Sequence, residues 1–296
     1  MPLPLRLGTS TAGLTRVLPD DLRARMLSNS ALAAEDADLM RNTAAACADE
    51  LAHSEVQSLE VFINQSLLHL GLDHPWLRIA DRRGEGYEIW SAHAPFGGID
   101  LASQDEELRN HSLQAVIASA RLAAKLGAGT LTLHSGKETP DPRQRPERLT
   151  LSASSIAAIA DLCAELNMKV AVELLPRRCL GNSVNELLDI VEMADRPNVG
   201  VCLDTTHSFP AAELTNVVRA LGQKLITVHI SDHDDNGEKH WLPLRGVVDW
   251  PAFVLSLREI GYTGPFMYEL PLRYPTIEEA VAALEDNYAT LMNSAR

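Results

Sequence analysis

Residues 169–176 read KVAVELLP and residues 199–208 read VGVCLDTTHS, and these two stretches decide the fold class. Each is a short, valine-rich apolar run that reaches a carboxylate, Glu173 in the first and Asp204 in the second. A continuous apolar strand is typical of a parallel sheet that is buried on both faces. The pattern therefore predicts parallel strands that carry acidic side chains near their carboxyl ends.

The same type of run recurs along the chain, with strands expected at residues 5–8, 58–63, 87–93, 130–134, 169–174, 199–204, 225–230 and 265–270. Amphipathic, alanine-rich helical patterns lie between them, at residues 34–52, 106–126, 152–166, 184–194, 211–221, 251–260 and 276–293. Eight β/α units in 296 residues predict an α/β fold, a (β/α)8 TIM barrel, as a single domain over residues 1–296. The alternative is an open doubly wound sheet, which normally carries a glycine-rich phosphate loop, and the chain has neither a GxGxxG nor a Walker sequence.

The first 57 residues fit this repeat least well. Residues 9–13 are expected to form a loop after the first strand. Pro19, Asp20 and Asp21 are typical of a helix start, because acidic residues are favoured in the first turn. The N-terminal segment is therefore expected to hold an extra helix.

Composition narrows the classes of partner. The chain has 26 basic and 40 acidic residues, a net charge of −14 that disfavours nucleic acid and anionic membranes. It has no signal-peptide pattern and no run of eighteen apolar residues, so we expect a cytoplasmic protein that binds no membrane. The cysteines occur singly, with no CxxC pair, and are expected to be small core residues: Cys47, Cys163, Cys179 and Cys202.

Six consecutive predicted strands end on a histidine or carboxylate, or are followed closely by one: His93, His134, Glu173, Asp204, His207, His229 and Glu269. In an α/β barrel the carboxyl ends of the strands meet at one rim, where active sites are built. A carboxylate inside an apolar run is costly to bury unless it is paired or bound to a metal. The sequence therefore predicts a divalent metal at this rim; carboxylates suit Mn²⁺, Mg²⁺ or Co²⁺, and additional histidines favour Zn²⁺.

The rim loops supply further candidates. A second metal, or direct contact with a substrate, is expected at His93, His134, His207, Glu238 and His240. Substrate contacts are expected at Arg177, Trp241 and Arg245. Residues 136–147, which include Lys137, Arg143 and Arg145, are expected either as a solvated loop or as a lid whose cations meet an anionic group.

Taken in order, several of these motifs resemble the xylose isomerase-like, or endonuclease IV-like, TIM-barrel superfamily. They are HAPFGGIDLAS, LHSG, VELLP, VGVCLDTTHS, the HISD and LRGVVDW pair, and YEL, and they span about residues 87–270. Residues 1–86 match weakly, mainly through RLGTS and SLEVF.

The resemblance implies a metal-dependent isomerase or epimerase that acts on a sugar or a related hydroxy-carbonyl compound through an enediolate. It implies metal ligands at Glu173, Asp204, His229 and Glu269. It also implies that Glu173 and Glu269 are catalytic and shuttle protons between neighbouring carbons or opposite faces of one carbon. The expected partner is a small sugar-like molecule, and self-association is left open.

Two other activities of the same fold stay open. The endonuclease branch cuts abasic DNA with three zinc ions held by nine residues, and this chain has candidates for all nine: His93, His134, Glu173, Asp204, His207, His229, Glu238, His240 and Glu269. The isomerase is favoured by three features: glutamate at position 238 where that branch has aspartate, a short loop ending in LPLRGVVDW, and the acidic net charge. Dehydratases of the fold use similar ligands. Sugar epimerases carry an arginine shortly after the strand-seven histidine, whereas here the nearest is Arg245, so the substrate is not identified by analogy.

Overall fold

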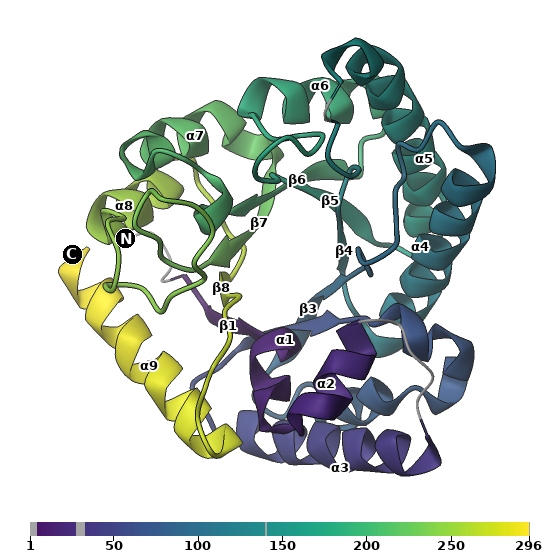
Figure 1. Ribbon diagram of the computed structural model, residues 1–296. Helices are drawn as coiled ribbons and strands as arrows, with labels where there is room; N and C mark the ends of the chain where they lie inside the picture. The colour runs from purple at the N-terminus through teal and green to yellow at the C-terminus, as the bar shows by residue number, and fades with distance from the viewer. Residues whose placement is uncertain (1–4, 28–32, 140, 296) are drawn as a thin grey trace.

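The computed structural model describes residues 5–27, 33–139 and 141–295. Eight parallel strands pair in sequence order and close into a barrel, with β1 beside β8 (Figure 1). The strands are β1 (Leu7–Ser10), β2 (Ser58–Phe62), β3 (Glu88–His93), β4 (Thr130–Leu133), β5 (Lys169–Glu173), β6 (Val199–Asp204), β7 (Leu225–Ile230) and β8 (Phe266–Tyr268). The TIM-barrel prediction is confirmed.

Helices surround the barrel in Figure 1. They are α1 (Thr11–Leu14), α2 (Asp20–Leu27), α3 (Ala34–Leu51), α4 (Glu106–Leu126), α5 (Arg145–Glu165), α6 (Val184–Ala194), α7 (Leu214–Leu221), α8 (Trp250–Glu259) and α9 (Ile277–Ser294). Short 3-10 turns lie between them: η1 (Thr15–Val17), η2 (Gln65–Asp73), η3 (Pro75–Arg82), η4 (Pro142–Gln144), η5 (Thr205–His207), η6 (Ala211–Glu213) and η7 (Gly222–Lys224). Within the described residues, no helix is both long and apolar enough to cross a membrane.

Helix α4 shows how local sequence sets these elements. The Asp105 side chain accepts hydrogen bonds from the backbone N–H groups of Glu107 and Leu108, which caps the first turn. Gly127 ends the helix with φ of 87°, a conformation that glycine adopts without a side-chain penalty. Small and apolar residues at helical spacing, including Ala115, Val116, Ser119, Ala120 and Ala123, form its buried face.

The predicted element boundaries need correction at several places, among them β8, which ends at Tyr268 rather than at residue 270, and α7, which begins at Leu214 rather than at residue 211. Strand β1 runs from Leu7 to Ser10, two residues later than expected. Residues 9–13 are not a loop, because the Ser10 hydroxyl accepts from the Ala12 N–H and starts α1. Helix α5 begins at Arg145 rather than at residue 152, with Pro146 in its first turn, where no N–H is needed.

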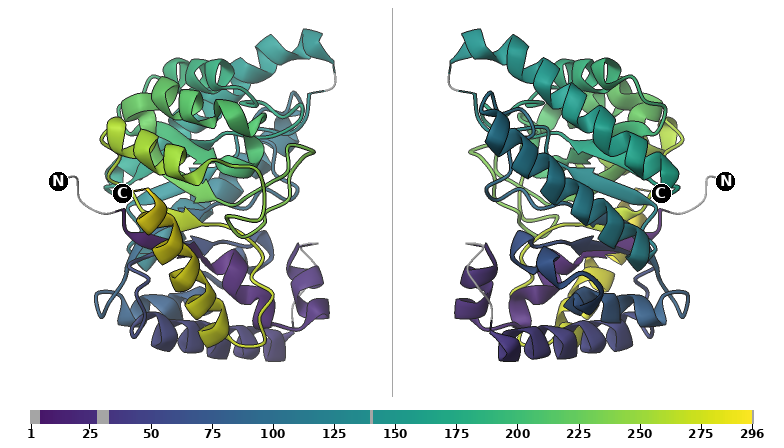
Figure 2. Two further views of the ribbon diagram at one scale, coloured as in Figure 1. Left: turned by 90° about the vertical axis from the view of Figure 1, so that its left-hand side faces the viewer. Right: turned by 90° about the vertical axis from the view of Figure 1, so that its right-hand side faces the viewer.

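The extra N-terminal helix is confirmed as α2. The side views in Figure 2 show α2, drawn in purple, at the end of the barrel from which the loops after the strands project. The N-terminal segment therefore contributes to the walls of the rim as well as to the barrel.

The long loop after β7 is anchored from below by Asp232, which is fully buried. One carboxylate oxygen accepts from the backbone N–H groups of His233 (2.9 Å) and Val248 (3.3 Å), and the other accepts from the Trp250 indole (2.9 Å). Gly246 packs so closely here that a Cβ atom on it would lie 2.1 Å from the His233 carbonyl oxygen. This packing fixes the base of the loop that carries Glu238 and His240.

We expect the Gly246→Ala substitution to destabilise the fold by about 1–3 kcal/mol, because the backbone oxygen of His233 cannot move aside cheaply. Urea unfolding, read as the change in free energy of unfolding, measures this. Gly129→Ala is the control, since the nearest atom to a Cβ there, the Trp90 carbonyl oxygen, lies 3.8 Å away. Equal stability of the two variants would contradict the packing argument.

Candidate metal centre

Four of the predicted ligands converge at the mouth of the barrel. Glu173 ends β5, Asp204 ends β6, His229 lies in β7 and Glu269 follows β8, and each offers a ligand atom within 4.8 Å of the others. Glu173, Asp204 and His229 are at most 1% exposed, whereas the Glu269 side chain is 17% exposed. The arrangement gives a buried centre of three carboxylates and one imidazole.

A second group of donors shares Glu173 with the first. The Nε2 atoms of His93 and His134 lie 3.0 and 3.1 Å from the same Glu173 oxygen, Oε2. Strand alternation explains the placement of His93, because residues two apart on a strand point to the same side, and Ser91 and His93 both face the barrel interior. These three side chains could hold a second ion.

A third group shares Asp204 with the first. Asp204, His207 and His240 offer ligand atoms close enough for one ion. Glu238 is not part of this set; its Oε1 atom instead lies 3.1 Å from Nε2 of His207. The structure thus brings all nine predicted metal or substrate residues to one rim, eight of them in potential ligand groups.

Sequence reasoning missed Glu60, a fully buried residue of β2. Its Oε2 atom accepts hydrogen bonds from the hydroxyls of Ser91 (2.7 Å) and Thr132 (3.0 Å), and its Oε1 atom lies 3.0 Å from Nε2 of His229. On its other side His229 directs Nδ1 toward Glu269, at 2.8 Å. Glu60 thus faces one ring nitrogen of His229 and leaves the other for the centre. The signal in the sequence that could have identified Glu60 is the glutamate inside the apolar stretch SLEVF.

The charges of the centre are strongly coupled. Burial lowers the pKa of His93, but the hydrogen bond and charge of Glu173 outweigh burial and raise it to about 9. The pKa of His229 is likewise raised well above its usual range, against burial, by neighbouring acidic groups that include Glu269 and Glu60. Burial raises the pKa of Asp204, whereas the His229 charge and hydrogen bond overcome burial at Glu269 and lower its pKa to about 2. Without metal, protonated histidines hold the carboxylates together.

The donor set fits a divalent metal. Several buried polar atoms have no well-aligned hydrogen bond: Asp204 Oδ2, Glu60 Oε1, and both ring nitrogens of His229. Unpaired buried polar groups are costly, and lone pairs that converge without donors are what a cation satisfies. Glu173, Asp204, His229 and Glu269 would hold the ion, and a mixed nitrogen and oxygen set suits Mn²⁺, Co²⁺ or Zn²⁺.

The structure places the predicted substrate-contacting residues in two different cavities. Arg177 lines the metal-side cavity and bridges Glu138, at 2.7 Å, and Glu238. Trp241 and Arg245 instead line a separate cavity with Lys239, Arg273 and Tyr274, so they are not brought together with the metal group.

The cations of residues 136–147 also differ in role. Lys137 lines the metal-side cavity. Arg143 pairs with Asp141 on the surface, at 2.7 Å. Arg145 pairs with Glu186 and donates to the Cys179 carbonyl, both within α5 and α6 packing. A lid built on all three cations is therefore not supported, because Arg145 is a structural residue.

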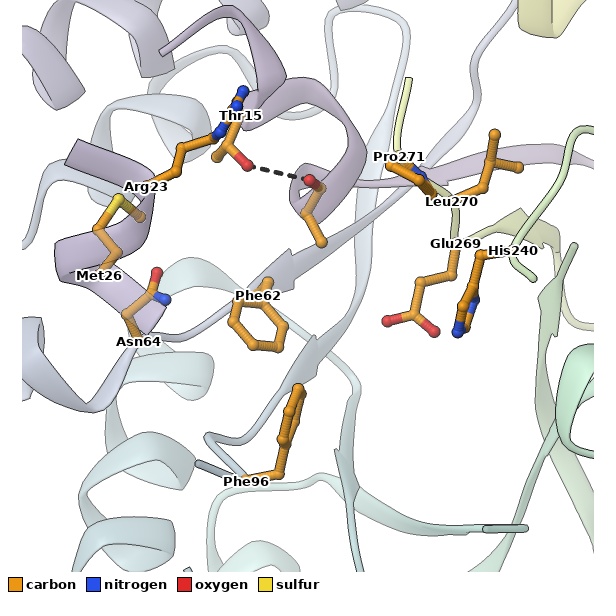
Figure 3. A pocket seen from close by; sticks show the side chains of 11 residues that line it. Thr15, Arg23, Met26, Phe62, Asn64, Phe96, His240, Glu269, Leu270 and Pro271 are labelled. Atoms are coloured by element: carbon orange, nitrogen blue, oxygen red, sulfur yellow. Dashed lines mark hydrogen bonds between the residues drawn. The ribbon is translucent and has the colours of Figure 1, made fainter. Parts of the chain in front are cut away.

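The rim cavity has two lobes that meet at Phe96, His240 and Glu269. The metal lobe has a volume of about 620 Å³ and includes His93, His134, Glu173, Asp204 and His207. The N-terminal lobe has a volume of about 290 Å³ and is lined further by Ala12, Thr15, Arg23, Met26, Phe62, Asn64, Leu270 and Pro271 (Figure 3). Glu269 stands between the metal group and the second lobe.

Comparison with known proteins agrees with the fold and the motifs. Residues 72–290 match the family model described as xylose isomerase-like TIM barrel. In sequence, the chain is 28% identical over 142 residues to inosose isomerase of Bacillus subtilis, covering 44% of this chain and 51% of the relative. It is 26% identical over 176 residues to ketose 3-epimerase of Arthrobacter globiformis, covering 57% and 59%. It is 28% identical over 196 residues to probable endonuclease 4 of Sulfurihydrogenibium sp., covering 58% and 68%.

A crystal structure of IolI protein with a bound zinc atom has the same fold, with a TM-score of 0.74, 19% identity and 99% coverage of both chains. The first curated relatives are matched over only about half to three fifths of their length, with 62%, 52% and 51% covered.

The raised histidine pKa values predict that metal binding releases protons. His229 is protonated near neutral pH without metal, and only its neutral form can bind an ion, so apparent metal affinity should rise with pH through the neutral range. Calorimetric titration with Mn²⁺ in buffers of different ionisation enthalpy measures the number of protons released. Binding without proton release, at an affinity independent of pH, would show that the imidazoles are not ligands.

Glu60→Gln should weaken metal binding about 10–100-fold, because the carboxylate that orients His229 is lost. Competition titration with Co²⁺, followed by its visible absorption, gives the affinity. The matched control is Glu88→Gln, the same change at a half-exposed residue that pairs with Arg6. If both variants bind Co²⁺ as the parent protein does, Glu60 does not support the centre.

Proposed function

Because the chain belongs to the xylose isomerase-like TIM-barrel family, we propose that it is a divalent-metal-dependent isomerase or epimerase. Its substrate is a sugar or a related compound with a hydroxyl beside a carbonyl. The names of two relatives, inosose isomerase and ketose 3-epimerase, support this class of reaction. The observation that carries the proposal is the placement of Glu173 at the end of β5 and Glu269 just after β8, on non-adjacent strands but in one group of potential metal ligands.

The two glutamates are suited to proton transfer. Glu173 opens into the metal lobe, while Glu269 borders both lobes, so a substrate between them is reached by one carboxylate on each side. The pKa of both groups is lowered against burial by neighbouring histidines, so both carboxylates are ionised, which is the form from which a general base acts. One glutamate takes the proton from the carbon beside the carbonyl. The other, which is also ionised, first takes a proton from a substrate hydroxyl or from water and then delivers it to the neighbouring carbon or the opposite face.

A bound divalent metal would polarise the substrate carbonyl and stabilise the negative charge that develops when the proton leaves. The chain's other residues orient the substrate and limit water. His134 stacks on Phe96, with ring centroids 4.7 Å apart, and the pair forms one wall of the metal lobe. Arg177 and Lys137 line the same lobe and can donate hydrogen bonds to substrate oxygens.

The test is hydrogen exchange at carbon. With Mn²⁺ bound, the protein should move deuterium from D₂O into at least one ketose or inosose of a substrate panel, as seen by proton NMR. Glu173→Gln and Glu269→Gln should each slow this exchange about 10²–10⁴-fold, because a positioned proton acceptor is lost. Glu165→Gln, a change at an exposed residue at the end of α5, is the control.

Metal content of each variant is measured in the same samples. Full exchange by Glu173→Gln with metal retained would rule out this proton shuttle. Consumption of the substrate with loss of water would assign the chain to the dehydratases instead.

A second candidate is a zinc phosphodiesterase that cuts DNA at abasic sites, as the name of the endonuclease 4 relative suggests. The specific observation in its favour is that the potential ligand groups overlap, with Glu173 and Asp204 each belonging to two of them, as a cluster of neighbouring ions would require. The net charge of −14 opposes it, because the phosphate backbone is repelled.

Metal stoichiometry and DNA cleavage separate the two candidates. We expect elemental analysis to find fewer than three zinc ions per chain and an abasic duplex to stay intact. Three zinc ions with cleavage of the abasic strand would replace the isomerase with the phosphodiesterase.

A further inference from the structure

The N-terminal lobe contains a polar group that proton transfer in the metal lobe does not use. Asn64, which follows β2, is only 6% exposed. Its side-chain amide neither caps the helical turn after it nor hydrogen-bonds to any other residue in the described part of the chain. It lines the lobe beside Met26 and Phe62 (Figure 3). The amide has no partner in the described part of the chain, yet its atoms are not sealed in the core, so it can donate to and accept from a ligand that enters the lobe.

The walls around Asn64 are apolar. Phe62 and Phe96 meet edge to face, with ring centroids 5.6 Å apart, and Phe96 is 41% exposed at the junction of the two lobes. Met26, Leu270 and Pro271 complete the apolar lining. Such a surface packs well against the C–H face of a sugar ring, whose hydroxyls then point outward to polar groups.

The chemistry of the polar groups favours hydroxyls over an anion. The amide of Asn64 offers both donors and an acceptor, which a hydroxyl satisfies from either side, whereas a phosphate or carboxylate can only accept. Arg23 lines the same lobe, but its guanidinium forms an ion pair with Asp20, so its charge is already countered. The lobe therefore presents hydrogen-bonding groups and little uncompensated charge.

We propose that the N-terminal lobe binds a second sugar ring, so that the substrate is a ketose glycosylated away from its carbonyl. This inference rests on the proposed function and adds the class of substrate. The reacting ketose unit, in its open-chain form, lies in the metal lobe against Glu269, and the attached ring lies between Phe62 and Leu270 with its hydroxyls on Asn64. The two lobes are neighbours that share Phe96, His240 and Glu269 in their linings, so a molecule that extends past these three side chains would reach from one lobe into the other.

The test compares D-fructose with two of its glucosylated forms, maltulose, which is substituted at O4, and isomaltulose, which is substituted at O6. Calorimetric titration of the Mn²⁺-loaded protein should show at least one disaccharide binding about tenfold more tightly than D-fructose, as one or two added hydrogen bonds allow. Saturation-transfer NMR should show glucosyl protons in contact with the protein.

Asn64→Ala and Asn64→Leu should each reduce this preference about tenfold, because the hydrogen bonds to the second ring are lost. Neither change breaks a hydrogen bond to a described residue, so both variants should fold. Asn110→Ala, at an exposed residue of α4, is the matched control and should keep the preference.

The outcomes separate this proposal from the proposed function. Suppose that the protein exchanges carbon-bound deuterium into D-fructose. If it then prefers no disaccharide, or if its preference survives both Asn64 changes, the sugar subsite is overturned and the isomerase proposal stands. Tighter binding of fructose 6-phosphate than of either disaccharide overturns it in favour of an anion. No binding and no exchange with any of these ketoses contradicts both proposals for ketose substrates.

Discussion

Four carboxylates are buried in the mouth of one barrel, and the site depends on how their mutual repulsion is countered. Glu60, Glu173 and Asp204 are almost completely buried, and Glu269 is mostly so. Like charges at this depth are tolerated only beside cations, and the chain supplies imidazoles whose pKa is raised, with His93, His207 and His229 each within hydrogen-bonding reach of at least one of these acids. A divalent metal would replace the protons on these rings. The raised histidine pKa values and the predicted metal affinity are thus two consequences of one electrostatic constraint.

The barrel fold allows this many charged side chains to be held close together. Each ligand leaves the end of a different strand, so the backbone holds the side chains in place before any ion binds. The layer below the centre is also polar, since Ser91 and Thr132 hold Glu60 beneath His229. The loop after β7 then adds Glu238 and His240 from above, on a base fixed by Asp232. Residues below the metal centre and residues of the loop above it therefore both help to position its side chains.

Much of this was predictable from sequence because the strands are nearly continuous apolar runs with abrupt polar ends. Strands β6 and β7 have the predicted bounds, and the residues at their ends, Asp204 and His229, meet as expected. Glu60 was missed because it lies inside the SLEVF stretch rather than at its end. A register shift between β2 and β3, at Leu59 and Glu60, accompanies its inward position. The lobe around Asn64 was also missed. It is formed by α1, α2 and the segment after β8, and no local pattern reports which distant segments share a cavity. Trp241 follows His240 in sequence yet lines a different cavity, because His240 has a left-handed backbone conformation, with φ of 47°, that turns the chain between the two side chains.

The central claim is that Glu173, Asp204, His229 and Glu269 together hold one divalent ion. Anomalous diffraction from crystals grown with Mn²⁺, recorded on both sides of the manganese absorption edge, tests it most directly. We expect the strongest anomalous peak among these four side chains, with Nδ1 of His229 facing the ion and Nε2 facing Glu60. A structure in which these four residues bind no metal, while Mn²⁺ occupies another part of the molecule, would contradict it.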